Sequence, residues 1–222
     1  MRIWVVGGTY GIGLETTRVL TSAGHFVRAS GSETDVRSAR LLREYAATLG
    51  PFDALVYSAG VNYLEWSDNL DCDKAAEVYD INVLGLVRVL QALLAADCDL
   101  QRVVVVGSDA AWRPMRTSLP YNASKAALHA AVQCIARERA SENFAINVVA
   151  PGLVEATGMT DDVLTQTKEV RGWDVDRTLK YMVDGIPLGR PIDPIEVAYV
   201  IRDVLESPPA VNGAIIPVNG AR

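Results

Sequence analysis

The chain has 222 residues, of which 50% are hydrophobic and 22% are charged, a balance typical of a globular domain and not of a disordered chain. Its formal net charge of −6 disfavours nucleic acid as a partner, because a polyanion would be repelled. The three cysteines, Cys72, Cys98 and Cys134, are far apart in the sequence, so they predict neither a disulfide framework nor a metal site.

Short apolar runs alternate with longer segments of helical periodicity from end to end. The runs predict buried strands over Ile3–Val6, Phe26–Ala29, Ala54–Tyr57, Val103–Val106, Ile146–Val149 and Ile215–Val218. The longer segments predict helices over Ile12–Ala23, Val36–Leu49, Lys74–Ala96, Pro120–Arg139 and Pro194–Leu205. This alternation predicts an α/β fold, a doubly wound parallel sheet with helices on both faces. Because no linker interrupts it, we expect residues 1–222 to form a single domain.

The sequence also bears on where the protein is located in the cell. The wholly apolar runs are only a few residues long and Met1 leads directly into the first strand, so we expect no membrane span, no signal peptide and a cytoplasmic protein.

Residues 155–186 form the one irregular segment: they are polar and uneven, and long insertions in compact domains usually carry function. We therefore expect a substrate lid over 155–186, with a surface elaboration that plays no part in binding as the alternative.

The first strand runs into a glycine-rich turn, and the first helix follows at once. Glycines allow the chain to turn tightly and let its backbone approach a pyrophosphate, which the N–H groups at the start of the helix would bind. The sequence therefore predicts a dinucleotide site here. The expected contacts are Gly7, Thr9, Tyr10, Gly11, Ile12 and Gly13.

Three polar residues form a candidate catalytic group. Tyr121 and Lys125 are four residues apart on a predicted helix, which places both side chains on one face. A free tyrosine has a pKa of about 10, and a neighbouring ammonium lowers it towards the working pH. Ser108 follows the strand Val103–Val106, at the end of a sheet where ligands bind, and its hydroxyl can hydrogen-bond a reacting oxygen.

The spacing G-x-x-x-G-x-G of the turn, together with Ser108, Tyr121 and Lys125, resembles the short-chain dehydrogenase/reductase family over nearly the whole chain. The resemblance is to its single-domain members with an Asn-Ser-Tyr-Lys tetrad. It implies a Rossmann fold with strand order 3-2-1-4-5-6-7 and a homotetramer. It also implies catalytic roles for Ser108, Tyr121 and Lys125, with Lys125 holding the nicotinamide ribose, and for Asn82, which would hold a water in a proton relay to Lys125.

The same resemblance implies cofactor contacts further along the chain. Asp35-Val36 would pack on the adenine, and Ser58-Ala59-Gly60 stands where the family has Asn-Ala-Gly. Pro151-Gly152-Leu153-Val154 would line the nicotinamide, with backbone bonds from Val154 to its carboxamide. Tyr121 and Lys125 would also touch the cofactor. The expected contacts next to the adenosine ribose are Ser30, Gly31 and Ser32.

The identity of the cofactor depends on the end of the second strand. An acidic residue there binds the ribose hydroxyls of NAD, whereas an arginine accepts the 2′-phosphate of NADP. Gly31 stands at the acidic position and Ser32 at the basic one, so neither determinant is present. The missing acid favours NADP over NAD, by about three to two.

The implied function is hydride transfer between a nicotinamide and a carbonyl or secondary alcohol of a small molecule, with Tyr121 as the acid/base. The alternative is a non-catalytic regulatory protein that senses NADP on the same fold, although such proteins typically lose the tyrosine or the lysine. The substrate is not specified by the sequence. Candidate pocket linings are Tyr63, Trp112, Leu153 and Trp173.

Overall fold

The computed structural model describes residues 1–222 and contains a six-stranded parallel sheet in the order β2-β1-β3-β4-β5-β6. The strands are β1 (Arg2–Val6), β2 (Phe26–Ser30), β3 (Ala54–Tyr57), β4 (Arg102–Val106), β5 (Ala145–Pro151) and β6 (Ile215–Val218). The helices are α1 (Gly11–Ser22), α2 (Ala39–Leu49), α3 (Cys72–Tyr79), α4 (Gly85–Ala95), α5 (Leu119–Arg139), α6 (Gly158–Arg171), α7 (Val175–Val183) and α8 (Pro194–Leu205).

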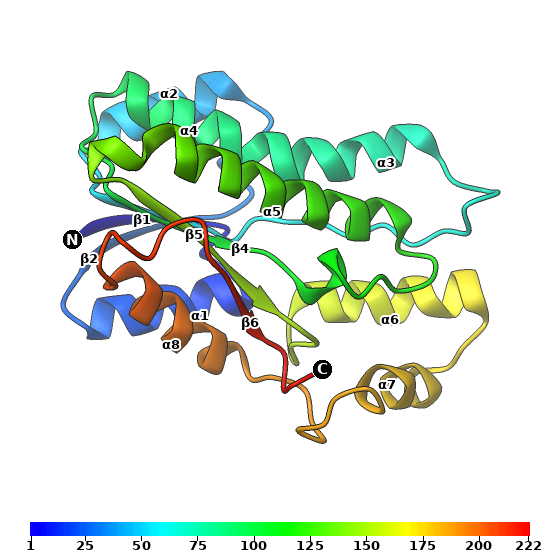
Figure 1. The fold of residues 1–222 in the computed structure, drawn as a ribbon. Helices are drawn as coiled ribbons and strands as arrows, with labels where there is room; N and C mark the ends of the chain where they lie inside the picture. Colours follow the sequence, from blue (N-terminus) through cyan, green and yellow to red (C-terminus); the bar gives the residue numbers. More distant parts are fainter.

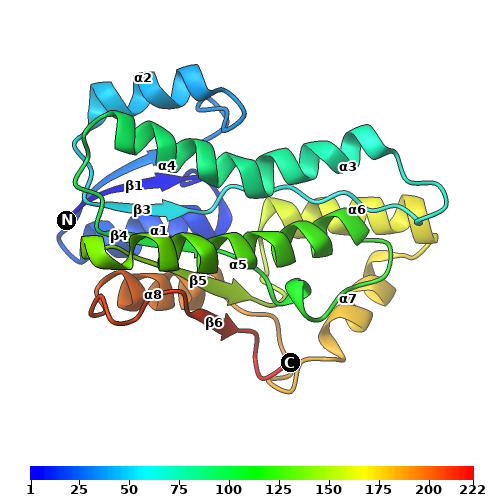
Figure 2. The ribbon, with the colours of Figure 1, turned by 45° about the horizontal axis from the view of Figure 1, so that its top comes forward.

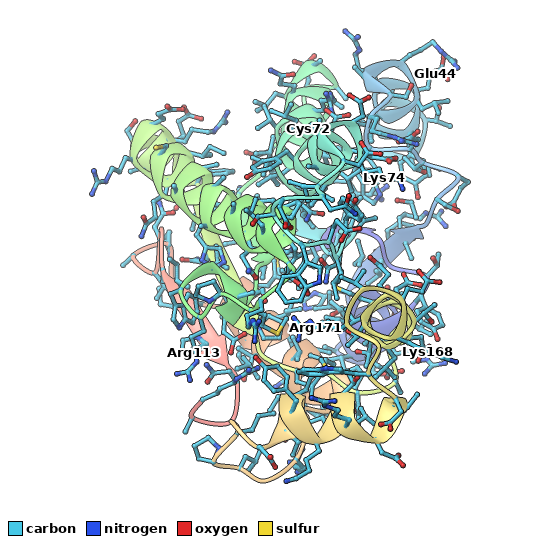
Figure 3. All side chains as sticks on the ribbon, turned by 90° about the vertical axis from the view of Figure 1, so that its right-hand side faces the viewer. Glu44, Cys72, Lys74, Arg113, Lys168 and Arg171 are labelled. Carbon is cyan, nitrogen blue, oxygen red and sulfur yellow. The ribbon has the colours of Figure 1, made fainter.

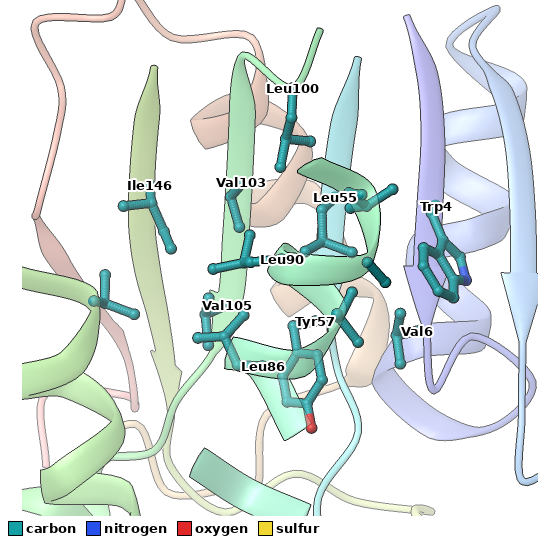
Figure 4. Packing of buried hydrophobic residues seen from close by; sticks show 14 of the residues in the cluster. Trp4, Val6, Leu55, Tyr57, Leu86, Leu90, Leu100, Val103, Val105 and Ile146 are labelled. Carbon is teal, nitrogen blue, oxygen red and sulfur yellow. The ribbon is translucent and has the colours of Figure 1, made fainter. Parts of the chain in front are cut away.

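Helices α2, α4 and α5 cover one face of the sheet, and α1 and α8 cover the other (Figures 1 and 2). Alternation along the strands divides the core between the two faces. Trp4 and Val6 join the larger core cluster beneath α4 (Figure 4). Ile3 and Val5 join the cluster beneath α1 and α8. Because both faces are buried, the strands are apolar throughout, which explains their continuous apolar runs in the sequence.

The doubly wound parallel fold is confirmed, but the sheet has six strands and not the seven of the expected order. Only residues 31–38 connect β2 to α2, which is too short a segment for a helix and a further strand. The outermost strand of the expected order, numbered 3 there, is therefore absent, and β2 is the outermost strand on this side. The remaining strands keep the expected order.

The helix predicted over Lys74–Ala96 is real but irregular. Helices α3 and α4 are joined without a break by a π-helical turn over Asp80–Leu84. By length and composition alone, the stretch Cys72–Ala95 would suffice to cross a membrane. In the structure Leu86, Val89 and Leu93 are fully buried against the sheet, as in a core helix.

The segment 155–186 is not irregular, which corrects the sequence-based expectation. It contains α6 and α7, each begun by a side-chain cap: Thr157 Oγ1 accepts from the amide of Thr160 at 3.2 Å, and Asp174 Oδ1 from that of Arg177 at 2.8 Å. Gly172, with φ of 67°, ends α6 in the left-handed conformation. The apolar faces of the two helices pack in a small separate cluster that includes Val163 and Met182.

Candidate active site

A cavity of about 500 Å³ opens at the carboxyl ends of the strands, where ligands bind in doubly wound sheets. It brings together most of the predicted site. The predicted residues that line it are Gly7, Thr9, Tyr10, Gly11, Ile12, Gly31, Ser32, Asp35, Val36, Ser58, Ala59, Gly60, Ser108, Tyr121, Lys125, Pro151, Gly152 and Val154. Gly13, Ser30 and Asn82 lie behind its wall.

The glycine turn has the shape that a pyrophosphate needs. Gly7 and Gly11 have φ of 76° and 52°, a region that side chains disfavour. A Cβ on Gly13 would lie 2.0 Å from the carbonyl oxygen of Gly7, so this glycine allows α1 to pack against the turn. Tyr10 precedes α1 without a side-chain cap, which leaves amide groups of the first turn free for a ligand. The turn therefore fits a dinucleotide phosphate.

The end of β2 carries a carboxylate that the sequence reasoning missed. Glu33 Oε1 accepts a hydrogen bond from the amide of Gly31 at 2.7 Å. A Cβ on Gly31 would lie 2.9 Å from Glu33 Oε2, so this carboxylate fills the space that a side chain at position 31 would use. Glu33 was not predicted because it lies beyond the end of β2, in the connection to α2, outside the motifs that the sequence offers.

Ser30 faces the interior and does not contact the cavity. The hydroxyl of this fully buried residue accepts a hydrogen bond from the indole of Trp4 at 3.0 Å. Ser30 is therefore corrected from a cofactor contact to a core residue. Asp35 and Val36, the predicted adenine contacts, both line the cavity. Arg37 hydrogen-bonds the Asp35 carboxylate and lowers its pKa.

The predicted catalytic side chains converge on one wall of the cavity. Burial raises the pKa of Tyr121 to about 12, which is opposite to the lowering expected from Lys125 in the sequence. The hydrogen bond with Ser108 acts to lower this pKa, and the charge of Asp109 acts to raise it. Lys125 Nζ donates to the carbonyl oxygen of Val106 at 3.0 Å and lies 5.7 Å from the centroid of the Tyr121 ring. Burial lowers the pKa of Lys125 to about 8.

Asn82 lies one layer behind these groups, within the π-helical turn. Its amide group pairs with both backbone groups of Val61: Oδ1 accepts from the nitrogen at 2.9 Å, and Nδ2 donates to the oxygen at 3.0 Å. Nδ2 also donates to Ser124 Oγ at 2.9 Å. A Cβ on Gly60 would lie 3.3 Å from Asn82 Oδ1 and 3.5 Å from Lys125 Nζ. Asn82 therefore positions the backbone next to Lys125, and π-helical turns of this kind are frequent at functional sites.

His129 supports Ser108 from behind. Its Nε2 accepts from the amide of Ser108 at 3.4 Å, and a Cβ on Gly107 would come within 2.3 Å of the same nitrogen. Burial and the nearby charge of Lys125 lower the pKa of His129 to about 4. The imidazole is therefore neutral near pH 7, as an acceptor requires.

The rest of the cavity combines apolar residues with two opposite charges. Its apolar lining includes Met115, Leu153, Val163 and Met182, and its charged groups near Ser108 are Asp109 and Arg222. Of the predicted pocket linings only Leu153 reaches the cavity, whereas Tyr63, Trp112 and Trp173 do not. Arg171, labelled in Figure 3, lies at the end of α6. It donates to Thr117 Oγ1 at 2.9 Å and ties α6 to the loop before α5.

Comparisons with known proteins identify a family and several relatives. Residues 31–168 match the model of a family described as short chain dehydrogenase. The chain is 31% identical to the 3-oxoacyl-acyl-carrier-protein reductase MabA of Mycobacterium tuberculosis, over 98% of this chain and 91% of that protein. It is 25% identical to the vibriobactin-specific 2,3-dihydro-2,3-dihydroxybenzoate dehydrogenase of Vibrio cholerae, over 92% and 88%. A crystal structure of an actinorhodin polyketide ketoreductase variant with NADPH superposes with a TM-score of 0.91 and 26% identity, over 99% of this chain and 95% of that one.

Proposed function

The chain belongs to the short chain dehydrogenase family and is an NAD(P)-dependent oxidoreductase of carbonyl and alcohol groups, and from this premise we propose that Tyr121 is its acid/base. The observation that carries the proposal is the convergence of Tyr121, Ser108 and Lys125 on one wall of the cavity. A bound nicotinamide dinucleotide supplies or accepts the hydride. The protein groups bind the substrate oxygen and move its proton.

Tyr121 and Ser108 act together on the substrate oxygen. With its pKa at about 12, the phenol of Tyr121 is protonated at neutral pH and is ready to donate to a carbonyl oxygen during reduction. The Ser108 hydroxyl, whose oxygen accepts from the amide of Ala110 at 3.2 Å, donates to the same substrate oxygen and stabilises its developing charge. In the oxidative direction Tyr121 takes the proton back, and the positive charge of Lys125 favours the phenolate.

Lys125 is the residue that we assign to proton transfer and to binding of the cofactor ribose, and Asn82 positions the backbone beside it. Lys125 is held on the Val106 carbonyl between Tyr121 and Gly60, so its ammonium can hydrogen-bond a ribose hydroxyl and pass a proton inwards. Asn82 fixes Val61, which keeps this path open beside Gly60. Pro151, Gly152 and Val154 form the wall proposed for the nicotinamide.

The preference between the two dinucleotides depends on opposing features. The missing acid at Gly31 and the NADPH in a solved relative support NADP, as the sequence favours. Glu33 opposes that preference, because its carboxylate is bonded to the amide of Gly31 and would repel a 2′-phosphate that bound beside Gly31. We therefore propose that Glu33 controls cofactor specificity, because its negative charge shifts the preference towards NAD.

Helices α6 and α7, within 155–186, are the proposed lid. Met159, Val163 and Met182 line the cavity from this side. The cap of α6 at Thr157 packs on the glycine turn, since a Cβ on Gly11 would lie 3.2 Å from Thr157 Cγ2. A lid anchored on the phosphate turn at one end and on Thr117 at the other would close over cofactor and substrate together.

A panel of ketones and secondary alcohols, incubated with NADPH, NADH or their oxidised forms, tests the function. We expect cofactor-dependent absorbance changes at the reduced-nicotinamide band with some members of the panel. Binding of the cofactor without turnover of any member would favour the non-catalytic regulatory protein instead.

A further inference from the structure

Arg222 brings a guanidinium that forms no ion pair into the cavity that also holds Ser108 and Tyr121. Its side chain lines the same cavity as Ser108 and Tyr121, and its Nε is buried without a hydrogen-bond partner. A buried donor left without an acceptor is unfavourable, so such groups usually have a ligand or water as partner. Arg222 takes part in none of the ion pairs of the structure.

The backbone around Arg222 is held in place. The amide of Arg222 donates to the carbonyl of Asn219 at 3.3 Å, and Asn219 Nδ2 donates to the carbonyl of Arg222 at 3.2 Å. The preceding Gly220 accepts from the amide of Leu188 at 3.1 Å. The guanidinium lies over Gly185, where a Cβ would stand 3.5 Å from Nε. The side chain is therefore presented from a bonded turn next to the proposed lid.

Asp109 is a carboxylate that lines the same cavity as Arg222, but the two side chains form no ion pair. Its carboxylate is buried beside Ser108, and its one hydrogen bond to a side-chain donor comes from Asn219 Nδ2 at 3.5 Å. Burial raises the pKa of Asp109, and the charges of Arg222 and Arg113 lower it. Arg222 thus feels Asp109 at a distance and keeps its hydrogen-bond donors for another acceptor.

Resting on the proposed oxidoreductase function, we propose that Arg222 binds a carboxylate of the substrate, which is therefore an oxo acid or hydroxy acid. The reacting oxygen lies on Ser108 and Tyr121, the carboxylate on the guanidinium of Arg222, and the apolar body against Leu153, Val163 and Met182. A guanidinium suits a carboxylate because its planar fork offers two parallel donors. Arg222 is then the residue that selects acids over neutral ketones of the same shape.

The test measures binding apart from turnover. Apolar carboxylates that cannot react, each paired with its carboxamide, are titrated calorimetrically into the cofactor-loaded protein. We expect the wild type to bind acids about 10- to 100-fold more tightly than their amides. Arg222→Met should abolish that difference, Arg222→Lys should retain part of it, and Arg113→Met is the control that removes a nearby positive charge from outside the cavity lining.

Equal affinity for every acid and its amide in the wild type would overturn the inference, as would the same loss of discrimination in Arg113→Met and Arg222→Met. Repeating the titration with Tyr121→Phe separates this inference from the proposed function. Discrimination should survive in that variant. A protein that discriminates acids from amides but never oxidises or reduces any compound would refute the catalytic proposal and leave the carboxylate site standing.

Discussion

Lys125 is held by a hydrogen bond from its Nζ to the backbone carbonyl of Val106, 3.0 Å away at the end of β4. The bond places the ammonium in the cavity wall, but it does not offset the burial of the charge, because the pKa of Lys125 falls to about 8. The catalytic wall is therefore built at a cost to stability. That cost depends on pH.

Replacing Lys125 with methionine should remove this pH dependence. Between pH 8 and pH 10 the unfolded chain, with an ordinary lysine pKa, binds more protons at this residue than the folded protein does, so the free energy of unfolding rises with pH. We expect a rise of about 2 kcal/mol from this residue in the wild type and its loss in Lys125→Met. Urea unfolding at pH 8, 9 and 10 measures it, with exposed Lys180→Met as the control. Parallel curves for the wild type and Lys125→Met would contradict the expected shift.

Tyr121→Phe should reduce turnover while sparing the fold. The change removes one hydroxyl, and a positioned acid/base group contributes about 100- to 10,000-fold to the rate. We expect kcat to fall within that range and the dissociation constant of the cofactor to change little, as measured by steady-state kinetics and fluorescence titration. Tyr199→Phe, on the exposed surface of α8, is the matched control. A variant with near-normal kcat would exclude Tyr121 as the acid/base.

Glu33→Gln should shift the cofactor preference towards NADP. The substitution removes a negative charge next to Gly31 and keeps a group able to accept the hydrogen bond from its amide. Ser32→Arg should act in the same direction, because an arginine–phosphate bond is worth about 1.5–3 kcal/mol. We expect each change to raise the ratio of kcat/KM for NADP over NAD about tenfold or more. Glu44→Gln on α2 is the control, and unchanged ratios would show that the end of β2 does not contact the ribose.

Gly31→Asp changes the cofactor preference in the opposite direction, but it also crowds the end of β2. A Cβ at this position would stand 2.5 Å from Thr9 Oγ1 and 2.9 Å from Glu33 Oε2. Gly31→Asp should therefore weaken binding of both dinucleotides as well as favouring NAD, and the double variant with Glu33→Gln should recover part of the loss.

We expect the protein to form a homotetramer, as the family resemblance implies and as closed symmetry favours. Light scattering at working concentration measures the mass directly. A particle of 24.0 kDa would be the monomer and would refute this expectation.

The fold was predictable because its signals are local and repeated. Buried strands such as β4 read as apolar runs, and α8 begins where Pro194 follows Asp193, whose side chain caps the helix. Helices α6 and α7 were missed because their buried residues are few and widely spaced. Their caps, Thr157 and Asp174, with Gly172 at the end of α6, were the available signal.

The candidate site was predictable where residues lie in motifs and not where distant segments meet. Tyr121 and Lys125 share a helix face, so spacing alone brings them together. Arg222 and Asp109 are far apart in the sequence and line one cavity only because β4 and β6 end at the same edge of the sheet. The hydroxyl of Ser30 faces the core and accepts a hydrogen bond from the indole of Trp4 on the neighbouring strand. No local pattern in the sequence reveals this contact.

The short connection after β2 also affects how the protein avoids aggregation through the edge of its sheet. Without a further strand, one side of β2 presents backbone groups that could pair with a strand of another molecule, which is a common route to aggregation. The structure protects this edge. Tyr45 donates its hydroxyl to the carbonyl of Ala29 at 3.3 Å, and Arg2 and Arg28 each lie 4.7 Å from the ring centroid of Phe26. The covered carbonyl of Ala29 and the charges around the exposed ring of Phe26 discourage a second chain from adding to the sheet.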